Sequence, residues 1–257
     1  MAVGIDLVKN GEADAFVTAG NTGGAMTTAY FRLGTIPGVE RPALAATFPV
    51  KNGFVLVLDI GANPDCKPEH LLQFAIMGSV FVSKTRGIAN PRVAILSNGE
   101  ESGKGNELVR TAYPLLAASG LNYIGNVEGK ELFGGATDVV VTDGFTGNIL
   151  LKSSEAVARL LTDIIKEELK SGPLTMLGAL LAKPAFARVK EMMDPDAYGA
   201  APLLGVNGLV FIGHGRSNAR ALVSAIRAAR SAVDANVLSA TQLAIQDSIS
   251  KAIIQGV

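Results

Sequence analysis

The sequence predicts an α/β fold in which a mostly parallel sheet carries helices on both faces. Short apolar runs alternate with helix-like stretches, and five of these runs end in a short loop that combines Gly with Asn, Asp, Ser or Thr. Continuous apolar runs are typical of strands covered on both faces. Strands that alternate with helices favour parallel pairing through right-handed crossovers.

Each predicted element follows from local composition. The predicted strands are short and rich in β-branched or aromatic residues, and they span 15–18, 54–58, 92–96, 138–142 and 208–212. The predicted helices span 25–33, 68–83, 106–119, 150–169 and 220–235. Pro68 suits a first helical turn, where its missing N–H costs nothing. Residues 122–126 are a candidate for a further strand.

Residues 171–194 interrupt this alternation, because they contain no strand pattern and include Pro173 and Pro184. Apolar residues recur there at helical spacing, and basic residues accompany them: Leu174, Leu177, Leu180, Leu181, Phe186, Val189, Met193, Lys183, Arg188 and Lys190. We interpret the segment as a helical hairpin outside the sheet. The pattern alone favours packing against the body or a second subunit over membrane contact. We expect one domain over 1–257, with the hairpin at 171–194.

Composition excludes several classes of function. The 23 basic and 23 acidic side chains cancel, so no overall charge favours nucleic acid. No apolar run reaches the roughly 18 residues of a spanning helix, and residues 1–12 lack the apolar core of a signal peptide, which predicts a cytoplasmic protein. The single cysteine, Cys66, permits no internal disulfide, and two distant histidines offer no metal-ligand spacing.

The five polar loops predict a ligand site. They are Ala19-Gly-Asn-Thr-Gly-Gly24, Asp59-Ile-Gly-Ala-Asn63, Ser97-Asn-Gly-Glu-Glu-Ser-Gly-Lys-Gly105, Thr142-Asp-Gly-Phe-Thr-Gly-Asn148 and Gly213-His-Gly-Arg-Ser-Asn218. In a parallel sheet such loops meet at one edge, where strand ends and helix starts line a crevice. Glycine allows close approach of a ligand, and free N–H groups at helix starts attract anions such as phosphate.

Other motifs are weak. The spacing Gly213-x-Gly215-x-x-Asn218 resembles a dinucleotide fingerprint, but the third position is not Gly or Ala, and Asp234 lies in or after a helix. The run Gly99-x-x-x-Gly103-Lys104-Gly105 is too short for a nucleotide P-loop and has no Ser or Thr for magnesium.

Cys66 has no obvious base beside it and is best explained as a small, partly buried residue. His70 follows Pro68 in a first helical turn, where it can cap the helix or face solvent. His214 lies inside a glycine-rich loop, so contact with a ligand is at least as well supported as a packing role. No nucleophile elbow is present; if the reaction is acyl transfer to inorganic phosphate, no protein nucleophile is required, because phosphate is already anionic.

Ordered motifs along the chain resemble one family. They are Ala19-Gly-Asn-Thr-Gly23, Leu33-Gly-Thr-Ile-Pro-Gly38 with Arg41-Pro42, the segment 65–75, Gly105-Asn-Glu107, Tyr123-Ile-Gly-Asn-Val-Glu-Gly129, Asp143-Gly-Phe-Thr-Gly-Asn148 and Ala201-Pro-Leu-Leu-Gly205. This set resembles the bacterial phosphate acyltransferases, the PlsX family. The resemblance implies a Rossmann-like sheet similar to phosphate acetyltransferases and the isocitrate dehydrogenase group. It also implies a homodimer and peripheral contact of the hairpin with the cytoplasmic membrane.

The implied reaction converts long-chain acyl carrier protein and inorganic phosphate into acyl phosphate and free carrier, for phospholipid synthesis, with no cofactor and no metal. We expect Lys104 and Asn148 to be catalytic, by neutralising phosphate or the developing oxyanion and by donating a hydrogen bond. Positions in the loops and matched motifs make the following candidates for substrate binding: Gly20, Asn21, Thr22, Gly23, Asn63, Asn126, Asp143, Thr146 and His214.

The sequence departs from the family's pattern at two places. The family's chains begin earlier, with an Asp-Ala-Met-Gly-Gly-Asp motif on the first strand, whereas this sequence opens at Met1-Ala-Val-Gly. Ala200 stands where the family has a second Gly. We therefore expect a chain truncated at its N-terminus. The alternatives are a phosphate acetyltransferase that uses coenzyme A, and an inactive remnant that only dimerises or docks on a membrane.

Overall fold

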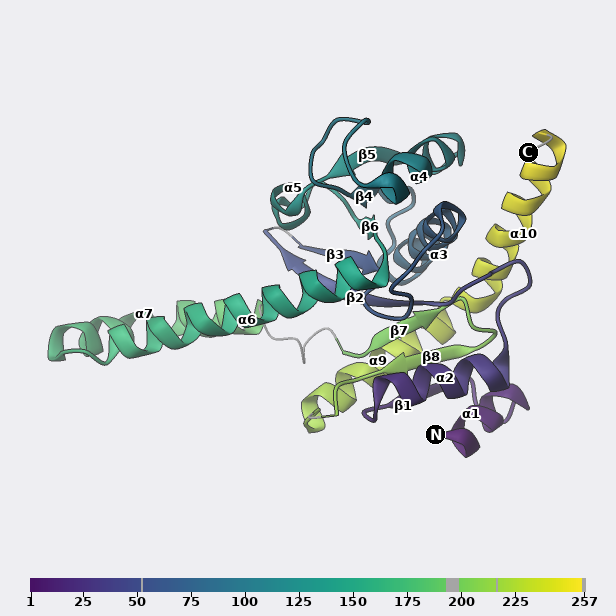
Figure 1. The fold of residues 1–257 in the computed structure, drawn as a ribbon. Helices are drawn as coiled ribbons and strands as arrows, with labels where there is room; N and C mark the ends of the chain where they lie inside the picture. The colour runs from purple at the N-terminus through teal and green to yellow at the C-terminus, as the bar shows by residue number, and fades with distance from the viewer. Residues whose placement is uncertain (52, 193–198, 216, 256–257) are drawn as a thin grey trace.

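The computed structural model describes residues 1–51, 53–192, 199–215 and 217–255. The strands in this part of the chain form one eight-stranded sheet in the order β1-β8-β7-β2-β3-β6-β4-β5 (Figure 1). Their bounds are β1 Ala15–Thr18, β2 Ala43–Val50, β3 Gly53–Leu58, β4 Val93–Leu96, β5 Tyr123–Val127, β6 Val139–Val141, β7 Ala201–Leu204 and β8 Leu209–Ile212. All five predicted strands and the candidate at 122–126 are confirmed, whereas β2 and β7 were not predicted.

The sheet is mostly parallel but changes direction in its middle. β1 pairs with β8 in parallel, and β3, β6, β4 and β5 form a second parallel group. Between the groups, the pairings of β8 with β7, β7 with β2 and β2 with β3 are all antiparallel. Three reversals leave the two parallel groups running in opposite directions.

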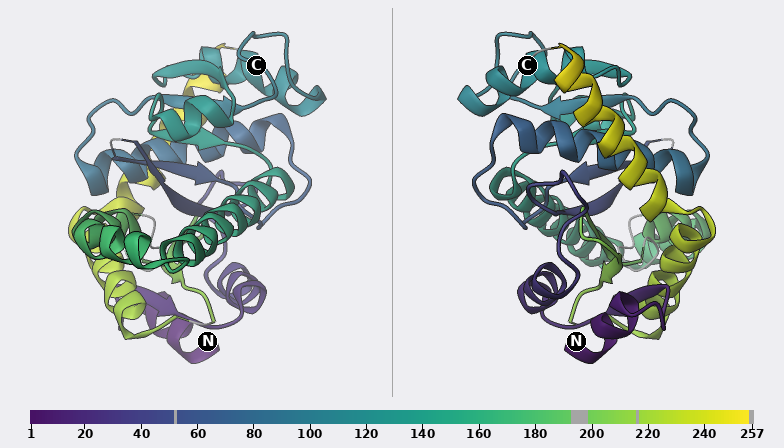
Figure 2. Two further views of the ribbon diagram at one scale, coloured as in Figure 1. Left: turned by 90° about the vertical axis from the view of Figure 1, so that its left-hand side faces the viewer. Right: turned by 90° about the vertical axis from the view of Figure 1, so that its right-hand side faces the viewer.

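Helices cover both faces of the sheet. One face packs against α3 Pro68–Arg86, α4 Glu107–Ala118, α9 Ala219–Asp234 and α10 Val237–Gln255. The other face packs against α1 Ala2–Lys9, α2 Thr22–Leu33, α5 Gly129–Gly134 and the start of α6 Gly144–Leu169. Alternate residues of each central strand enter opposite cores, as in Leu56 and Val57, because successive side chains of a strand point to opposite faces. The two views of Figure 2 show the three layers, with α10 lying against α3.

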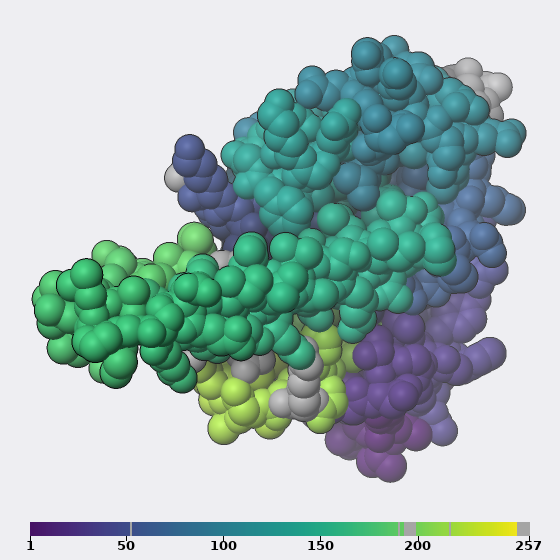
Figure 3. Space-filling view, turned by 60° about the vertical axis from the view of Figure 1, so that its left-hand side comes forward, coloured from purple at the N-terminus to yellow at the C-terminus, as the bar shows by residue number. Residues whose placement is uncertain are grey.

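A helical hairpin projects from this body, but its boundaries differ from the prediction. It consists of α6 and α7 Pro173–Met192, which turn back at Lys170–Gly172, so 171–194 is only its second arm. Pro184 lies inside α7 and does not end it. Figure 3 shows the two helices extending from the body as one arm. The side chain of Lys190 and residues 193 and 194 lie outside the described residues.

Candidate active site

Asp59, at the end of β3, organises the first loop of the site. Its carboxylate is fully buried and accepts hydrogen bonds from the backbone N–H groups of Leu44, Gly61, Ala62 and Asn63, at 2.6–3.1 Å. The Asn63 side-chain amide donates a further bond of 2.9 Å. Burial raises the pKa of Asp59, although these donors oppose the shift. The sequence alone indicates no role for Asp59, because its donors come both from β2 and from the loop after β3.

The loop after β6 packs directly on the Asp59 loop. Asp143 caps α6 by accepting bonds of 2.8 Å from the Thr146 N–H and from its hydroxyl. The Gly144 N–H donates to the Asn63 carbonyl at 2.8 Å. A Cβ at Gly147 would overlap the Asp59 carbonyl oxygen, so only glycine permits this approach. The structure therefore brings Asn63, Asp143 and Thr146 together.

Asn148 lies one turn into α6 and is exposed. Its side-chain amide nitrogen is 3.6 Å from the position that a Cβ on Gly61 would occupy, so the Asp59 loop and Asn148 adjoin. The start of α6 adds the positive end of the helix dipole. The amide thus lies beside a rigid loop at a helix N-terminus, where it can donate to an anion.

Lys104 belongs to the loop between β4 and α4, at the same sheet edge, because β4 is parallel and adjacent to β6. This loop is fixed by the Gly105 N–H, which donates to Asn98 Oδ1 at 2.9 Å. Asn126, on β5, donates from its amide to the Glu101 carbonyl at 2.7 Å, and it is only 5% exposed. Within the described residues, Asn126 Oδ1 and Ser97 Oγ are buried without a hydrogen-bond partner. The Lys104 side chain is exposed above this loop.

The remaining predicted residues lie together at the other edge of the sheet. The Gly213 N–H donates to the Thr18 carbonyl at 2.7 Å, which joins the β8 and β1 loops. Asn21 caps α2 by accepting from the Gly24 N–H at 2.8 Å, and the Gly20 N–H donates to Thr18 Oγ1 at 3.2 Å. Thr22 and Gly23 form the first turn of α2, and His214 is exposed beside these loops.

The prediction that all five loops meet at one edge is therefore wrong. The carboxyl ends of β3, β6 and β4 lie at one edge, and those of β1 and β8 lie at the opposite edge, because β7 and β2 reverse the strand direction. Helix α6 links the two groups of loops. It starts at the β6 loop and passes the β8 loop, where Glu155 Oε1 lies 3.7 Å from His214 Nε2.

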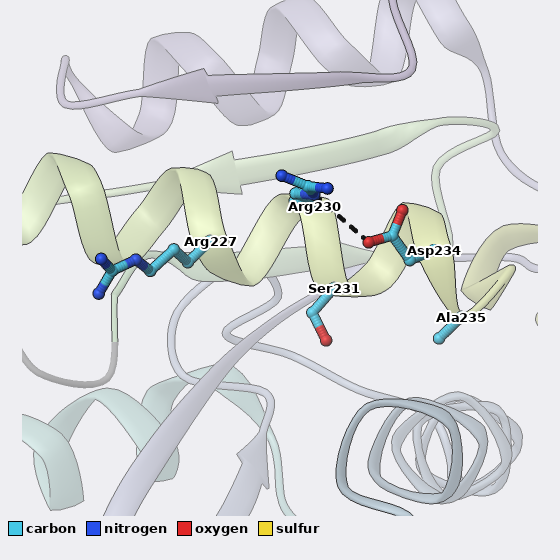
Figure 4. A pocket seen from close by; sticks show the side chains of 5 residues that line it. All are labelled: Arg227, Arg230, Ser231, Asp234 and Ala235. Atoms are coloured by element: carbon cyan, nitrogen blue, oxygen red, sulfur yellow. Dashed lines mark ion pairs between the residues drawn. The ribbon is translucent and has the colours of Figure 1, made fainter.

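A cleft of about 770 Å³ lies between α6 and the β8 loop, next to the contact of Glu155 with His214. It is lined by Lys152, Glu155, Ala156, Arg159, Leu160, Asp163, His214 and Gly215. A second hollow of about 450 Å³ lies on α9 and contains none of the predicted site residues (Figure 4). There Asp234, which the weak dinucleotide motif would need for a ribose, is the last residue of α9 and lies 3.5 Å from Arg230 Nε.

The surroundings of Cys66 and His70 indicate structural roles for both residues. Burial, and then the nearby Asp59 carboxylate, raise the pKa of the Cys66 thiol to about 12, so it stays protonated at neutral pH. His70 caps α3 by accepting from the Lys67 N–H at 3.1 Å, and its other ring nitrogen lies 3.2 Å from Glu40 Oε2. It is 4% exposed, so capping is confirmed and exposure to solvent is not. Across the described residues, no group of three possible metal ligands occurs and no helix is long and apolar enough to cross a membrane.

Comparison with known proteins gives one consistent result. A family model described as fatty acid synthesis protein matches residues 1–240. The phosphate acyltransferase of Elusimicrobium minutum is 53% identical over 239 residues, which cover 93% of this chain and 70% of that protein. The phosphate acyltransferase of Pelotomaculum thermopropionicum is 49% identical over 240 residues, with coverage of 93% and 70%.

Solved structures agree on the fold. The EutD phosphotransacetylase from Staphylococcus aureus superposes with a TM-score of 0.57 at 19% identity, covering 90% of this chain and 67% of that one. A branched-chain phosphotransacylase from Enterococcus faecalis gives a TM-score of 0.55 at 14% identity, covering 90% and 78%. The predicted Rossmann-like fold, similar to phosphate acetyltransferases, is confirmed.

Proposed function

The chain belongs to the fatty acid synthesis protein family of phosphate acyltransferases, and from this premise we propose that its acyl donor is long-chain acyl carrier protein. The acceptor is inorganic phosphate and the product is acyl phosphate, which serves phospholipid synthesis. The observation that carries the activity is the high identity to phosphate acyltransferases along nearly the whole chain. The loops at the β3, β6 and β4 edge supply groups suited to this chemistry.

In the proposed reaction, a phosphate oxygen attacks the thioester carbonyl carbon and forms the new C–O bond. The C–S bond then breaks, and the carrier leaves as a thiolate that takes a proton from solvent. Lys104 neutralises charge on phosphate or on the tetrahedral oxyanion, and the Asn148 amide donates a hydrogen bond to it. No protein nucleophile takes part, because phosphate supplies the attacking oxygen.

The other predicted site residues support the catalytic groups or contact the acyl donor in this proposal. Asn63, Asp143 and Thr146 shape the loop beside Asn148, and Asn126 supports the loop of Lys104. Gly20, Asn21, Thr22, Gly23 and His214 form the opposite edge, where they contact the donor. The support is that His214 lies 3.7 Å from Glu155 on α6, and that the β8 loop is hydrogen-bonded to the β1 loop through Gly213 and Thr18.

Transfer between acetyl-coenzyme A and phosphate is the less favoured activity. Phosphotransacetylases share the fold, but their identity to this chain is too low to indicate a common substrate. An inactive remnant that only dimerises or docks on a membrane is the other alternative. A donor comparison separates these three proposals.

We further propose that the protein is a homodimer that contacts the inner face of the cell membrane through the α6–α7 hairpin. The support is a set of exposed apolar side chains on α7, among them Leu174, Leu177 and Leu181, which are 82%, 55% and 76% exposed. Lys183 and Arg188 are exposed on the same helix. Apolar insertion and attraction to anionic lipid reinforce each other.

The activity is tested with the purified chain, palmitoyl carrier protein and radiolabelled phosphate. We expect free carrier and labelled acyl phosphate to form at equal rates, without added metal and without sensitivity to a chelator. Acetyl-coenzyme A is the comparison donor. Preference for acetyl-coenzyme A would refute the assignment of the donor, and a folded chain inactive with every donor would support the inactive remnant.

A further inference from the structure

The cleft between α6 and the β8–α9 loop has the properties of a ligand site. Its volume of about 770 Å³ lies within the range usual for small-molecule pockets. One wall is a single stripe of α6 that includes Lys152, Glu155 and Arg159, and the other is the loop with His214 and Gly215. Charged groups dominate the lining, so the cleft suits a polar ligand and not an acyl chain.

The charges of this cleft do not balance locally. Each of its two carboxylates lies near a basic side chain, since Glu155 Oε1 is 3.7 Å from His214 Nε2 and Asp163 Oδ1 is 3.3 Å from Lys166 Nζ. Its two strong bases, Lys152 and Arg159, have no ion-pair partner among the described residues. With Asp163 paired to Lys166, Lys152 and Arg159 outnumber the one remaining carboxylate, Glu155, so the sum of charge in the cleft is positive and favours an anionic ligand.

The cleft also has a fixed relation to the proposed chemistry. Asn148, Lys152, Glu155 and Arg159 follow one another at spacings of three and four residues, so they lie on one face of α6. At 1.5 Å per residue, Lys152 is about 6 Å and Arg159 about 16 Å from Asn148 along the helix axis. A long ligand with its reactive end at Asn148 would therefore extend its other end into the cleft.

We propose that Lys152 and Arg159 bind a phosphate group, namely the phosphodiester that attaches the thiol-bearing pantetheine arm to the acyl donor. This inference rests on the proposed function. Inorganic phosphate is the other source of such an anion, but it must touch the thioester carbonyl. Lys152 and Arg159 are one to three helical turns away from Asn148, so the acceptor does not fit this position. The polar arm itself fits the polar lining.

The test compares two donors that differ only in the phosphate: palmitoyl phosphopantetheine and palmitoyl pantetheine. We expect Lys152→Ala/Arg159→Ala to raise KM for the phosphorylated donor at least tenfold, since two charge-assisted contacts are lost. The wild-type preference for that donor should disappear, whereas KM for inorganic phosphate should not change. Lys130→Ala/Lys170→Ala is the matched control, because it removes two exposed charges outside the cleft and should behave as wild type.

Calorimetric titration with unacylated phosphopantetheine and pantetheine provides a readout that does not need turnover. We expect wild type to bind phosphopantetheine at least tenfold more tightly than the double variant does. Equal binding, or a rise in KM for inorganic phosphate instead, would overturn the proposal. If wild type binds the phosphorylated arm but transfers no acyl group, the proposed function fails while the assignment of the cleft stands.

Discussion

At the scale of single residues, the two proposed catalytic groups are held in different ways. Asn148 adjoins the Asp59 loop and lies at the start of a long helix, whereas Lys104 is an exposed side chain flanked by glycines at 103 and 105. A lysine in such a position supports little packing. Its contribution should therefore appear in the rate and not in the stability.

Lys104→Ala should lower kcat by roughly 100- to 1,000-fold, the usual effect of removing one donor that stabilises an oxyanion. The free energy of unfolding should change by less than about 0.5 kcal/mol, as for other surface substitutions. Steady-state kinetics and thermal denaturation measure the two effects. Lys130→Ala is the control, because Lys130 is 88% exposed on another helix. Near-normal turnover of a folded Lys104→Ala protein would remove Lys104 from the mechanism.

Asp59 is a positioning residue, because it fixes the loop against which Asn148 lies. In Asp59→Asn, an NH₂ group replaces one acceptor oxygen and faces N–H donors, so we expect a loss on the order of 2 kcal/mol in stability. We also expect kcat to fall more than tenfold with little change in KM. Asp138→Asn is the matched control. Asp138 also accepts hydrogen bonds, from Arg92, but it precedes β6 and so lies at the sheet edge opposite to Asp59.

Asp138→Asn should lower the melting temperature comparably but leave kcat within about twofold, because the Asp59 loop, against which Asn148 lies, is not disturbed. Kinetics are measured well below both melting temperatures, so that unfolding does not contribute. If both variants lose activity in proportion to their stability, Asp59 has only a structural role.

At the scale of elements, the hairpin has bounds different from the predicted 171–194, and Pro184 is the reason. Pro184 lies inside α7, although an interior proline removes one backbone hydrogen bond and usually ends or kinks a helix. The turn is instead formed by Lys170–Gly172, and the Gly172 N–H donates to Thr175 Oγ1 at 3.0 Å at the start of α7. Local composition therefore identified a helical projection, but not which helices form it.

Leu177→Glu/Leu181→Glu should release the protein from anionic vesicles while activity on acyl carrier protein in solution is largely retained. The reason is that two carboxylates oppose both apolar insertion and attraction to lipid. Vesicle sedimentation and size-exclusion chromatography are measured together. Leu243→Glu, at a 61% exposed leucine on α10, controls for charge alone. A monomeric or aggregated double variant would show that these leucines pack in a subunit interface.

The sequence predicts the strands that are continuous apolar runs. It does not predict the two strands that are recognisable only from their pairing with neighbouring strands. Val139–Val141 and Phe54–Leu58 are continuous apolar runs and were identified. β2 contains Pro49 and a Thr, and β7 begins Ala-Pro, so neither has the usual composition of a buried strand. These two strands reverse the sheet. Because the sequence does not predict these two strands, it identifies the residues of the site but not which edge of the sheet each of them occupies.

At the scale of the whole molecule, α6 is the element that relates the two edges of the sheet. Its first turn packs on the Asp59 loop, its middle contacts His214 and its end leads into α7, the second arm of the hairpin. Displacing its first turn should therefore disturb catalysis and the cleft together, although these lie at different edges.

Gly147→Ala tests this, because the added Cβ would overlap the Asp59 carbonyl oxygen and must move α6 away from the β3 loop. We expect a loss of about 1–3 kcal/mol in stability, a fall in kcat of more than tenfold and weaker binding of phosphopantetheine. Gly178→Ala is the control, since a Cβ there meets nothing within 4 Å, and alanine should stabilise α7 by about 0.5–1 kcal/mol. Calorimetric titration and kinetics are measured on both variants. If Gly147→Ala lowers kcat but leaves phosphopantetheine binding unchanged, the two edges are independent and α6 does not couple them.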